Sequence, residues 1–543
     1  MKRTVRDGIL RQRTGLLARR VALLAVSLVL AGLLVTPAGA DRNLFVGVDD
    51  NAFLAHTGVV VPFAQDLGLK SVRVTFNWFP GQSSISQADA AKLTKLVTSS
   101  PSTRIVVSAY SPSPWLVPLT TWDREDYCNF EGSILQQFPS INDLIVWNEP
   151  NLAVFWRPQF YGDGSSAAPA AYEMLLARCY DVLHAIRPGV NVIAPATCPR
   201  GSDISWNADS VSHSPGQFIL GLGAAYRASG RQRPLFDTVG HHVYGTYSAE
   251  RPWLVHSGST AISEGDWRAL MDALRQAFEG TAQRIPGECA GGSCMAIWYL
   301  EAGYQTTIDP AKRRFYSGVE PWLHLVPAAG GPPDPPAPPE TSWAPDQATQ
   351  LRDGLRLAYC QPYVQAFFNF LLIDEPDLGG WQSGVIWADG AKKGSYPAFK
   401  QAIAEVNSKQ VDCGDLKGDQ TAAGAVTVSG RAIHSSTSPK RLRLVLSVKN
   451  RAVAGSVVRL WLRFNRIVSN ERVQLQQLRN KRFHVMVRRN VNGFAPVLKL
   501  RMKKAGRYRI RVAYEEGSRY LFTRTKTIHI VRRKPHRHHR AHR

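Results

Sequence analysis

Two glutamates in this chain of 543 residues each stand where a short apolar run ends. Glu149 follows the run 144–146 and lies within Trp147-Asn148-Glu149-Pro150-Asn151, and Glu301 ends the run 297–300. Two carboxyl groups can divide the roles of acid and nucleophile between them if the fold brings them together. The first segment alone is equally typical of a strand-to-loop turn, because Asn and Pro are turn residues.

The surrounding chain alternates short apolar runs with longer segments of helical period, which predicts repeated strand and helix units. The predicted strands are Leu44–Val48, Ser71–Phe76, Ile105–Ala109, Leu144–Trp147, Val190–Ala196, Thr238–His242, Ala296–Leu300 and Val364–Leu372. The predicted helices include Ala168–Ile186, Pro215–Ala228, Asp266–Phe278, Asp346–Tyr359 and Tyr396–Val406.

Most of these strands are apolar throughout rather than alternating, as expected for parallel strands covered on both sides. Eight such units favour a (β/α)8 barrel, a TIM barrel, over residues 41–410. A doubly wound sheet is disfavoured because no Gly-rich phosphate turn follows the first strand. The Pro-rich stretch 326–339 is expected to be an irregular excursion after the seventh strand.

The active site of such a barrel lies at the carboxyl ends of its strands. Polar or aromatic side chains occur there on several strands besides the two glutamates: Arg73, Asn148, His242, Tyr244 and Trp387. An ordinary structural role is the alternative for such residues: Arg73 as an ion-pair partner, His242 as a core histidine and Trp387 as a core aromatic. Their joint placement on successive strands favours one shared site. Glycoside hydrolysis requires two carboxyl groups of this kind.

These residues resemble the retaining glycoside hydrolases of clan A. The resemblance spans residues 43–406 and rests on Trp147–Asn151, His242-Val243-Tyr244 and Glu301-Ala302-Gly303. Asn151-Leu152 followed by Phe155-Trp156 is most similar to family 39, whereas Arg73 and Trp387 are similar to family 5. Leu300 departs from the small polar residue that many members carry before the nucleophile.

The resemblance implies a role for each residue. Glu149 would be the general acid that later acts as base, and Glu301 the nucleophile. Asn148 would bind the sugar 2-hydroxyl, Tyr244 and Arg73 would orient Glu301, and Trp387 would form the floor under the sugar. Among the loop tryptophans Trp78, Trp115, Trp156, Trp253 and Trp381, we expect Trp78 and Trp156 to contact sugar as well.

We expect no metal or other cofactor. His241 and His242 are adjacent in a strand and point to opposite faces, so they cannot readily bind one ion together. Neither a Gly-x-Ser-x-Gly elbow nor a phosphate-binding loop occurs where one would be expected.

The amino end predicts export. Residues 1–20 carry seven Arg or Lys against one Asp, an uncharged run 21–36 follows, and Pro37–Ala40 ends in an Ala-x-Ala pattern. This is typical of a signal peptide over residues 1–40, and the run is short for a membrane span. We therefore expect a secreted or cell-surface protein with no membrane segment after cleavage.

Seven cysteines in an exported chain predict disulfides with one cysteine left over. Cys289 and Cys294 flank a Gly-rich tetrapeptide and are the easiest pair to close. Cys128 with Cys179 and Cys360 with Cys413 would link neighbouring helices of the barrel, leaving Cys198 unpaired. The sequence does not determine this connectivity, so other pairings stay open.

The charge divides the chain into two modules. Residues 41–410 have a net charge of −8, whereas residues 411–543 carry 32 Lys and Arg against 6 Asp and Glu. After a linker over 411–425, residues 426–533 show strands without helices, which favours a small all-β, immunoglobulin-like sandwich. The predicted strands are 426–428, 441–448, 457–463, 483–487, 497–500, 508–512 and 527–531. Within 505–512 we expect an edge or half-exposed strand with Arg facing water. Residues 534–543 are expected to be a disordered His/Arg-rich tail.

The sequence as a whole predicts a secreted retaining glycosidase acting on a carbohydrate substrate. The alternative is a barrel that binds glycans without cleaving them. The basic module is expected to bind an anionic cell-wall polymer or glycan, or to be a spacer. Nucleic acid is disfavoured because aromatic residues do not interleave with the basic ones.

Overall fold

The computed structural model describes residues 43–414 and 444–532, with gaps at 206–210, 258, 291–292, 323, 331–345, 449–450, 455, 465–467, 481, 494–496, 503 and 517–518. The predicted signal peptide, most of the linker, the strand 426–428 and the tail lie outside these residues. So does most of the Pro-rich stretch.

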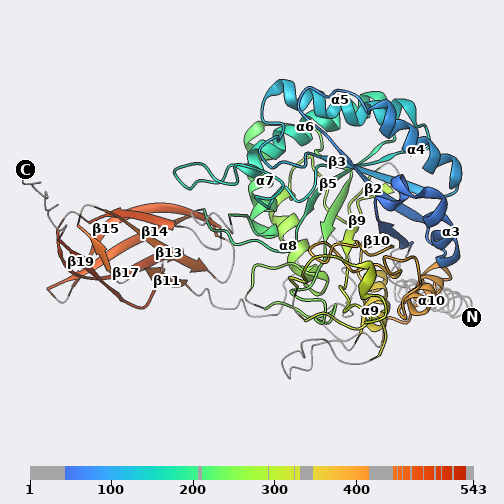
Figure 1. The fold of residues 1–543 in the computed structure, drawn as a ribbon. Helices are drawn as coiled ribbons and strands as arrows, with labels where there is room; N and C mark the ends of the chain where they lie inside the picture. Colours follow the sequence, from blue (N-terminus) through green and yellow to red (C-terminus); the bar gives the residue numbers. More distant parts are fainter. Residues whose placement is uncertain are drawn as a thin grey trace, which may run out of the picture.

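The first part of the described chain is a closed barrel of parallel strands, as predicted (Figure 1). Its order around the barrel is β1-β10-β9-β6-β5-β4-β3-β2. The strands are β1 (Phe45–Asp49), β2 (Ser71–Asn77), β3 (Arg104–Tyr110), β4 (Asp143–Val146), β5 (Asn191–Thr197), β6 (Thr238–His242), β9 (Ile297–Ala302) and β10 (Val364–Phe370). All eight sequence-predicted strands are therefore confirmed, with ends within a few residues. Because the strands are parallel, the loops that follow them all meet at one end of the barrel.

The strands are buried on both faces, which explains their apolar composition. Every residue of β4 and of β9 is buried. Inside the barrel Val106, Ile145 and Phe368 belong to one apolar cluster, while outward-facing side chains such as Val146 pack with the helices in another.

Helices surround the barrel and connect its strands. They are α2 (Ala52–Ala55), α3 (Thr57–Leu67), α4 (Gln87–Ser99), α5 (Thr121–Gln137), α6 (Ala168–Ile186), α7 (Pro215–Ser229), α8 (Trp267–Phe278), α9 (Gln347–Cys360) and α10 (Tyr396–Asn407), with short 3-10 turns η1 (Glu264–Asp266) and η2 (Arg313–Phe315). The five helices named from sequence are confirmed. No helix among the described residues is long and apolar enough to cross a bilayer.

The three disulfides expected from sequence are present. Cys128 pairs with Cys179, Cys360 pairs with Cys413, and Cys289 pairs with Cys294 across the hairpin β7 (Cys289–Ala290) and β8 (Ser293–Cys294). Cys198 is buried and has no disulfide partner.

The second described part is a β-sandwich. One sheet has the order β11-β13-β16, and the other has β12-β19-β17-β14-β15 with β18 paired to β17. These strands are β11 (Leu444–Val448), β12 (Arg451–Val453), β13 (Val457–Phe464), β14 (Val468–Arg479), β15 (Arg482–Gly493), β16 (Val497–Arg501), β17 (Gly506–Glu516), β18 (Arg519–Phe522) and β19 (Lys526–Val531). Side chains from both sheets, such as Leu460 and Ile510, share one core.

Some details of the sandwich differ from expectation, and β12, β14 and β18 all lie outside the predicted strands. The strand β14 was not predicted, because its sequence VSNERVQLQQLR is polar although Val473 and Leu475 are buried. The suggestion that 505–512 is an edge strand is wrong, since β17 pairs with β14 on one side and β19 on the other. Arg507 and Arg509 are nonetheless exposed, as the half-exposed alternative predicted.

Candidate active site

Glu301 lies in β9 at the carboxyl end of the barrel and is held by two side chains from other strands. Arg73 of β2 places Nη1 2.7 Å from its Oε1, and the Tyr244 hydroxyl donates to its Oε2 at 3.0 Å. Tyr244 follows the end of β6 by two residues. Glu301 is 8% exposed, so its carboxylate is nearly enclosed by these partners.

Glu149 follows β4 on a sharply turned segment. Trp147 and Glu149 have φ angles of 68° and 39°, in the left-handed region that costs energy for residues other than glycine. The turn is held because the Glu149 N–H donates to the carbonyl oxygen of Ala196 at 3.0 Å. Backbone strain of this kind is concentrated where a side chain must take a particular direction.

His242 joins the two glutamates. Its Nδ1 lies 2.8 Å from Oε1 of Glu149 and 3.3 Å from Oε2 of Glu301. A ligand atom of each of the three residues lies within 4.8 Å of those of the other two. The two carboxyl groups predicted from sequence are therefore close neighbours.

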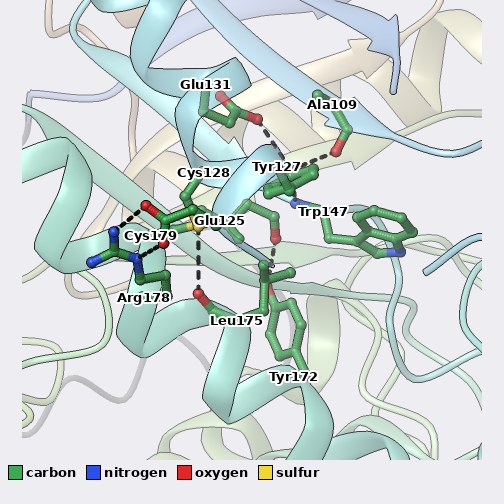
Figure 2. The surroundings of a disulfide bond; sticks show 11 residues. Ala109, Glu125, Tyr127, Cys128, Glu131, Trp147, Tyr172, Leu175, Arg178 and Cys179 are labelled. Carbon is green, nitrogen blue, oxygen red and sulfur yellow. Dashed lines mark hydrogen bonds and ion pairs between the residues drawn. A yellow bond between two sulfur atoms is a disulfide. The ribbon is translucent and has the colours of Figure 1, made fainter. Parts of the chain in front are cut away.

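The backbone at the end of β4 is fixed by two tyrosines from the flanking helices (Figure 2). The Trp147 N–H donates to the Tyr127 hydroxyl of α5 at 2.9 Å, and the Tyr172 hydroxyl of α6 donates to the Val146 carbonyl at 2.6 Å. The disulfide formed by Cys128, the residue after Tyr127, ties α5 to α6. The helices that position the Glu149 segment are thus covalently linked.

Asn151 ends the five-residue segment and connects it to the loop after β5. Its side-chain Nδ2 donates to the carbonyl oxygens of Cys198 and His213 at 3.2 and 3.0 Å, and its Oδ1 accepts from the Cys198 N–H at 2.9 Å. Asn151 is fully buried. Its role is therefore structural, since it holds the two loops beside Glu149 together.

Arg73 is the centre of a buried charge network. Besides Glu301, it contacts Oδ2 of Asp49 at 3.0 Å and donates from Nη2 to Oδ1 of Asn148 at 2.8 Å. Burial lowers the pKa of Arg73, but Asp49 and Glu301 more than offset this and the pKa lies above its ordinary value. Burial raises the pKa of Asp49 to about 8 against the opposing effect of Arg73. The guanidinium therefore stays charged and pairs with Glu301.

Asp49 and Tyr110 are site residues that sequence analysis missed. Asp49 ends β1, so it follows the same pattern of a carboxylate after an apolar run. Tyr110 ends β3, and burial followed by the charge of Glu301 raises its pKa to about 12. Burial, reinforced by Glu301, likewise raises the pKa of Tyr244 well above its ordinary value. Both phenols are therefore neutral.

The tryptophan expectations need correction. Trp78 and Trp156 are fully buried and pack edge-to-face on Trp147, so neither can stack on a sugar. Trp387 is buried in a separate cluster with Tyr316 and Leu378. Trp381 is instead the tryptophan beside the glutamates: it is half-buried, and its ring lies 4.9 Å from that of Tyr244.

The two histidines of β6 have different surroundings, as their opposite directions predict. His241 is hydrogen-bonded to Thr197 and to the Ile262 carbonyl, and burial lowers its pKa to about 4. Only His242, with Glu149 and Glu301, belongs to a group among the described residues that could bind a metal ion. The guanidinium of Arg73 2.7 Å from Glu301 opposes a cation at that position.

Cys198 is the remaining group beside Glu149. Burial raises the pKa of its thiol well above the ordinary value, and the charge of Glu149 and a hydrogen bond to it act in the same direction. The thiol is therefore neutral.

Comparisons with known proteins yield only remote likenesses. No protein-family model and no curated protein matches the chain. A β-glucuronidase from Ruminococcus gnavus in complex with uronic deoxynojirimycin matches 66% of this chain with 9% identity and a TM-score of 0.36, and a second structure of that enzyme gives 9% and 0.35. This chain covers about half of theirs, 49% and 50%. An engineered protein matches 90% of this chain and 94% of its own with 12% identity and a TM-score of 0.34. At these values the likenesses assign neither a family nor an activity.

Proposed function

We propose that the barrel is a retaining glycoside hydrolase of the clan A type, cleaving β-linked O-glycosidic bonds of oligo- or polysaccharides. The observation that carries this proposal is the pair of glutamates from β4 and β9, whose facing oxygens lie within 4.8 Å. Carboxyl groups about 5–5.5 Å apart suit a retaining mechanism, whereas inverting enzymes need roughly 6.5–9.5 Å to admit a water molecule.

In the first step, an oxygen of Glu301 attacks the anomeric carbon while Glu149 donates its proton to the glycosidic oxygen. The bond from that carbon to the leaving oxygen breaks, and a covalent glycosyl-enzyme remains. In the second step, Glu149 accepts a proton from water, the water oxygen bonds to the anomeric carbon, and Glu301 is released as a carboxylate.

The surrounding residues assist these steps. The contacts of Arg73 and Tyr244 hold the Glu301 carboxyl group in place. Oδ1 of Asn148 is occupied by Arg73, so its amide nitrogen is the group that can donate to a substrate hydroxyl. Trp381, rather than Trp387, is the aromatic side chain suited to the floor beneath the reacting sugar.

A screen of aryl β-glycosides tests this proposal. Replacing Glu301 by Ala should abolish hydrolysis, and azide should restore turnover with a product of inverted anomeric configuration. Glu125→Ala, which removes an exposed carboxylate on α5, is the control and should leave activity unchanged. Full activity of the Glu301→Ala variant would exclude the mechanism.

A barrel that binds glycans without cleaving them is the second candidate, because Glu301 lies in a buried ion pair with Arg73. The pairing also suits a nucleophile, which must be ionised to attack. Calorimetric titration of the wild-type protein with β-linked oligosaccharides separates the two: binding without any product after prolonged incubation would favour the second candidate.

The sandwich is proposed to tether the exported enzyme to an anionic polymer of the cell wall. Arg507 and Arg509 are exposed on one face of β17, and Arg511 on the same face lies with its guanidinium 3.6 and 3.9 Å from the ring centres of Phe483 and Phe522. Stacking holds this arginine extended, which lowers the entropy lost on binding.

Co-sedimentation with isolated cell walls at increasing salt tests the tether. Arg507→Glu/Arg509→Glu should abolish binding that the wild-type protein shows at low salt, whereas Lys70→Glu/Lys95→Glu on the barrel, with the same change in net charge, should not. Binding that persists undiminished at high salt would overturn an electrostatic tether. Preferential binding to DNA over walls would identify a nucleic-acid surface instead.

A further inference from the structure

Exposed apolar side chains of the barrel are concentrated at the end that carries the two glutamates. The structure describes fourteen large ones, and all but Val59 and Met174 lie between the end of a strand and the body of the next helix. These twelve are Phe79, Trp115, Leu116, Leu119, Trp122, Val154, Tyr161, Tyr247, Val255, Phe315, Val319 and Trp322. Apolar side chains that are exposed side by side mark a binding site, whereas single ones are ordinary.

Four of the twelve come from one short stretch after β3, which we call the apolar ledge: Trp115, Leu116, Leu119 and Trp122. Their exposed fractions are 69%, 39%, 40% and 81%. Trp122 lies in the first turn of α5.

The backbone of the ledge is held in place by a buried side chain, a hydrogen bond and a helix cap. Val117, between its members, is buried at 4% exposure and accepts a hydrogen bond from the Leu119 N–H. The helix that follows begins with a capping box in which Thr120 and Asp123 bond each other reciprocally. Exposing two tryptophans on a fixed backbone costs solvation energy, which binding of a partner would recover.

Contacts join the ledge to the active site. The Arg157 guanidinium lies 5.0 Å from the centre of the Trp115 ring, and the Arg157 N–H donates to the Pro114 carbonyl at 3.0 Å. Arg157 belongs to the loop after β4, and two residues before it the Phe155 ring packs 5.4 Å from Tyr110. The Phe155 carbonyl also accepts from Trp147 Nε1 at 3.1 Å. The ledge thus continues from the site along the loops after β3 and β4.

We propose that the apolar ledge binds sugar units of the substrate that lie beyond the bond being cleaved. Its occupant is a glycan chain, because the flat C–H faces of pyranose rings stack on tryptophan while Arg157 can donate to their hydroxyls. The substrate is accordingly a chain longer than a disaccharide. The inference rests on the proposed glycosidase function and adds to it the class of substrate.

Chain-length dependence tests the ledge. After the aryl glycoside screen has identified the sugar, kcat/KM is measured for unlabelled β-linked oligosaccharides of two to six units. In the wild-type protein kcat/KM should rise with length, and Trp115→Ala should lower it about fivefold for five and six units, since one aromatic contact contributes ~1 kcal/mol. Trp115→Ala should leave aryl monosaccharide hydrolysis and disaccharide hydrolysis unchanged.

Met174→Ala is the matched control, because Met174 is 46% exposed on the outer helix α6. Since Trp115 is exposed, its replacement should not unfold the protein, and thermal denaturation verifies this. Equal values of kcat/KM for two and six units, or for wild-type and Trp115→Ala protein on six units, would overturn the ledge while leaving the glycosidase proposal intact. A wild-type protein that hydrolyses no aryl glycoside would instead refute the proposed function itself.

Discussion

The Nδ1 atom of His242 lies 2.8 Å from Oε1 of Glu149. The imidazole is fully buried, so this contact fixes the direction of the carboxyl group that would protonate the leaving oxygen. His242 does not itself exchange a proton with the substrate in this account. It is a positioning residue for Glu149.

Replacing His242 by Ala should therefore slow glycosidic bond cleavage most where acid assistance matters most. We expect kcat/KM to fall about 100-fold for aryl glycosides with poor leaving groups and much less for activated ones, as general acid assistance typically contributes about 10²–10⁴-fold. A plot of log(kcat/KM) against leaving-group pKa measures this. An equal loss at every leaving group would show that His242 does not act through Glu149; His184→Gln, on α6, is the control.

Loss of Arg73 should destabilise the whole barrel. Arg73→Met leaves Asp49 and Glu301 buried beside each other without a cation, which typically costs about 3–5 kcal/mol of unfolding free energy. The exposed pair of Arg178 with Glu125 provides the control, because Arg178→Met should cost about 1 kcal/mol or less. Urea denaturation measures both, and equal losses would contradict the buried network.

Part of this network could be predicted from the sequence alone. Parallel strands buried on both faces are apolar throughout. Their positions and the polar residues at their ends could therefore be identified from the sequence. Asp49 ends β1 in the same way and could have been found by that criterion. The hydrogen-bond or ion-pair partner of each side chain could not be predicted, because it depends on which strands meet around the barrel.

The tryptophans show why loop residues are harder to predict. Trp78, Trp156 and Trp381 all lie in loops that follow strands, yet the first two pack into the core and only Trp381 reaches Tyr244. The conformation of each loop determines whether its tryptophan is buried, and no periodic pattern in the sequence reveals that conformation. The strand β14 was missed for a related reason, because Gln474, Gln476 and Gln477 are buried in it although glutamine is ordinarily exposed.

Removing the disulfide near Glu149 should cost more stability than removing the hairpin disulfide. Cys128 and Cys179 are 51 residues apart, whereas Cys289 and Cys294 are 5 apart. Loop-closure entropy then predicts losses of about 4 and about 2 kcal/mol for the respective double alanine variants. Denaturation midpoints of the two variants test the order, and a reversed order would contradict it.

Stability should decrease in alkaline solution through His256. Its ring lies 2.7 Å from Asp266 and 2.8 Å from Glu250, and hydrogen bonds to these groups raise its pKa from 6.5 to about 10. A raised histidine pKa gives stability that is fully present below pH 6.5 and is lost as the pH rises through 10. The contribution is on the order of 5 kcal/mol at most, and solvent screening lowers it.

The difference in unfolding free energy between the wild-type protein and His256→Gln isolates this effect. Buried acids whose pKa is raised, such as Asp49 and Glu131, also reduce stability as the pH rises, but they are present in both proteins and cancel. The difference should shrink steadily between pH 6.5 and 10. A difference that does not vary with pH would show that His256 is uncharged in the folded protein.

In the proposed mechanism Glu301 forms a covalent bond with the sugar. The direct measurement is mass spectrometry of peptides after incubation with an activated 2-deoxy-2-fluoroglycoside, which slows release of the glycosyl-enzyme. We predict a single added fluoroglycosyl group on the peptide that contains Glu301, and its absence in a Glu301→Gln variant. Labelling of another carboxylate, or turnover of active substrate with inverted configuration and no labelling, would contradict the account.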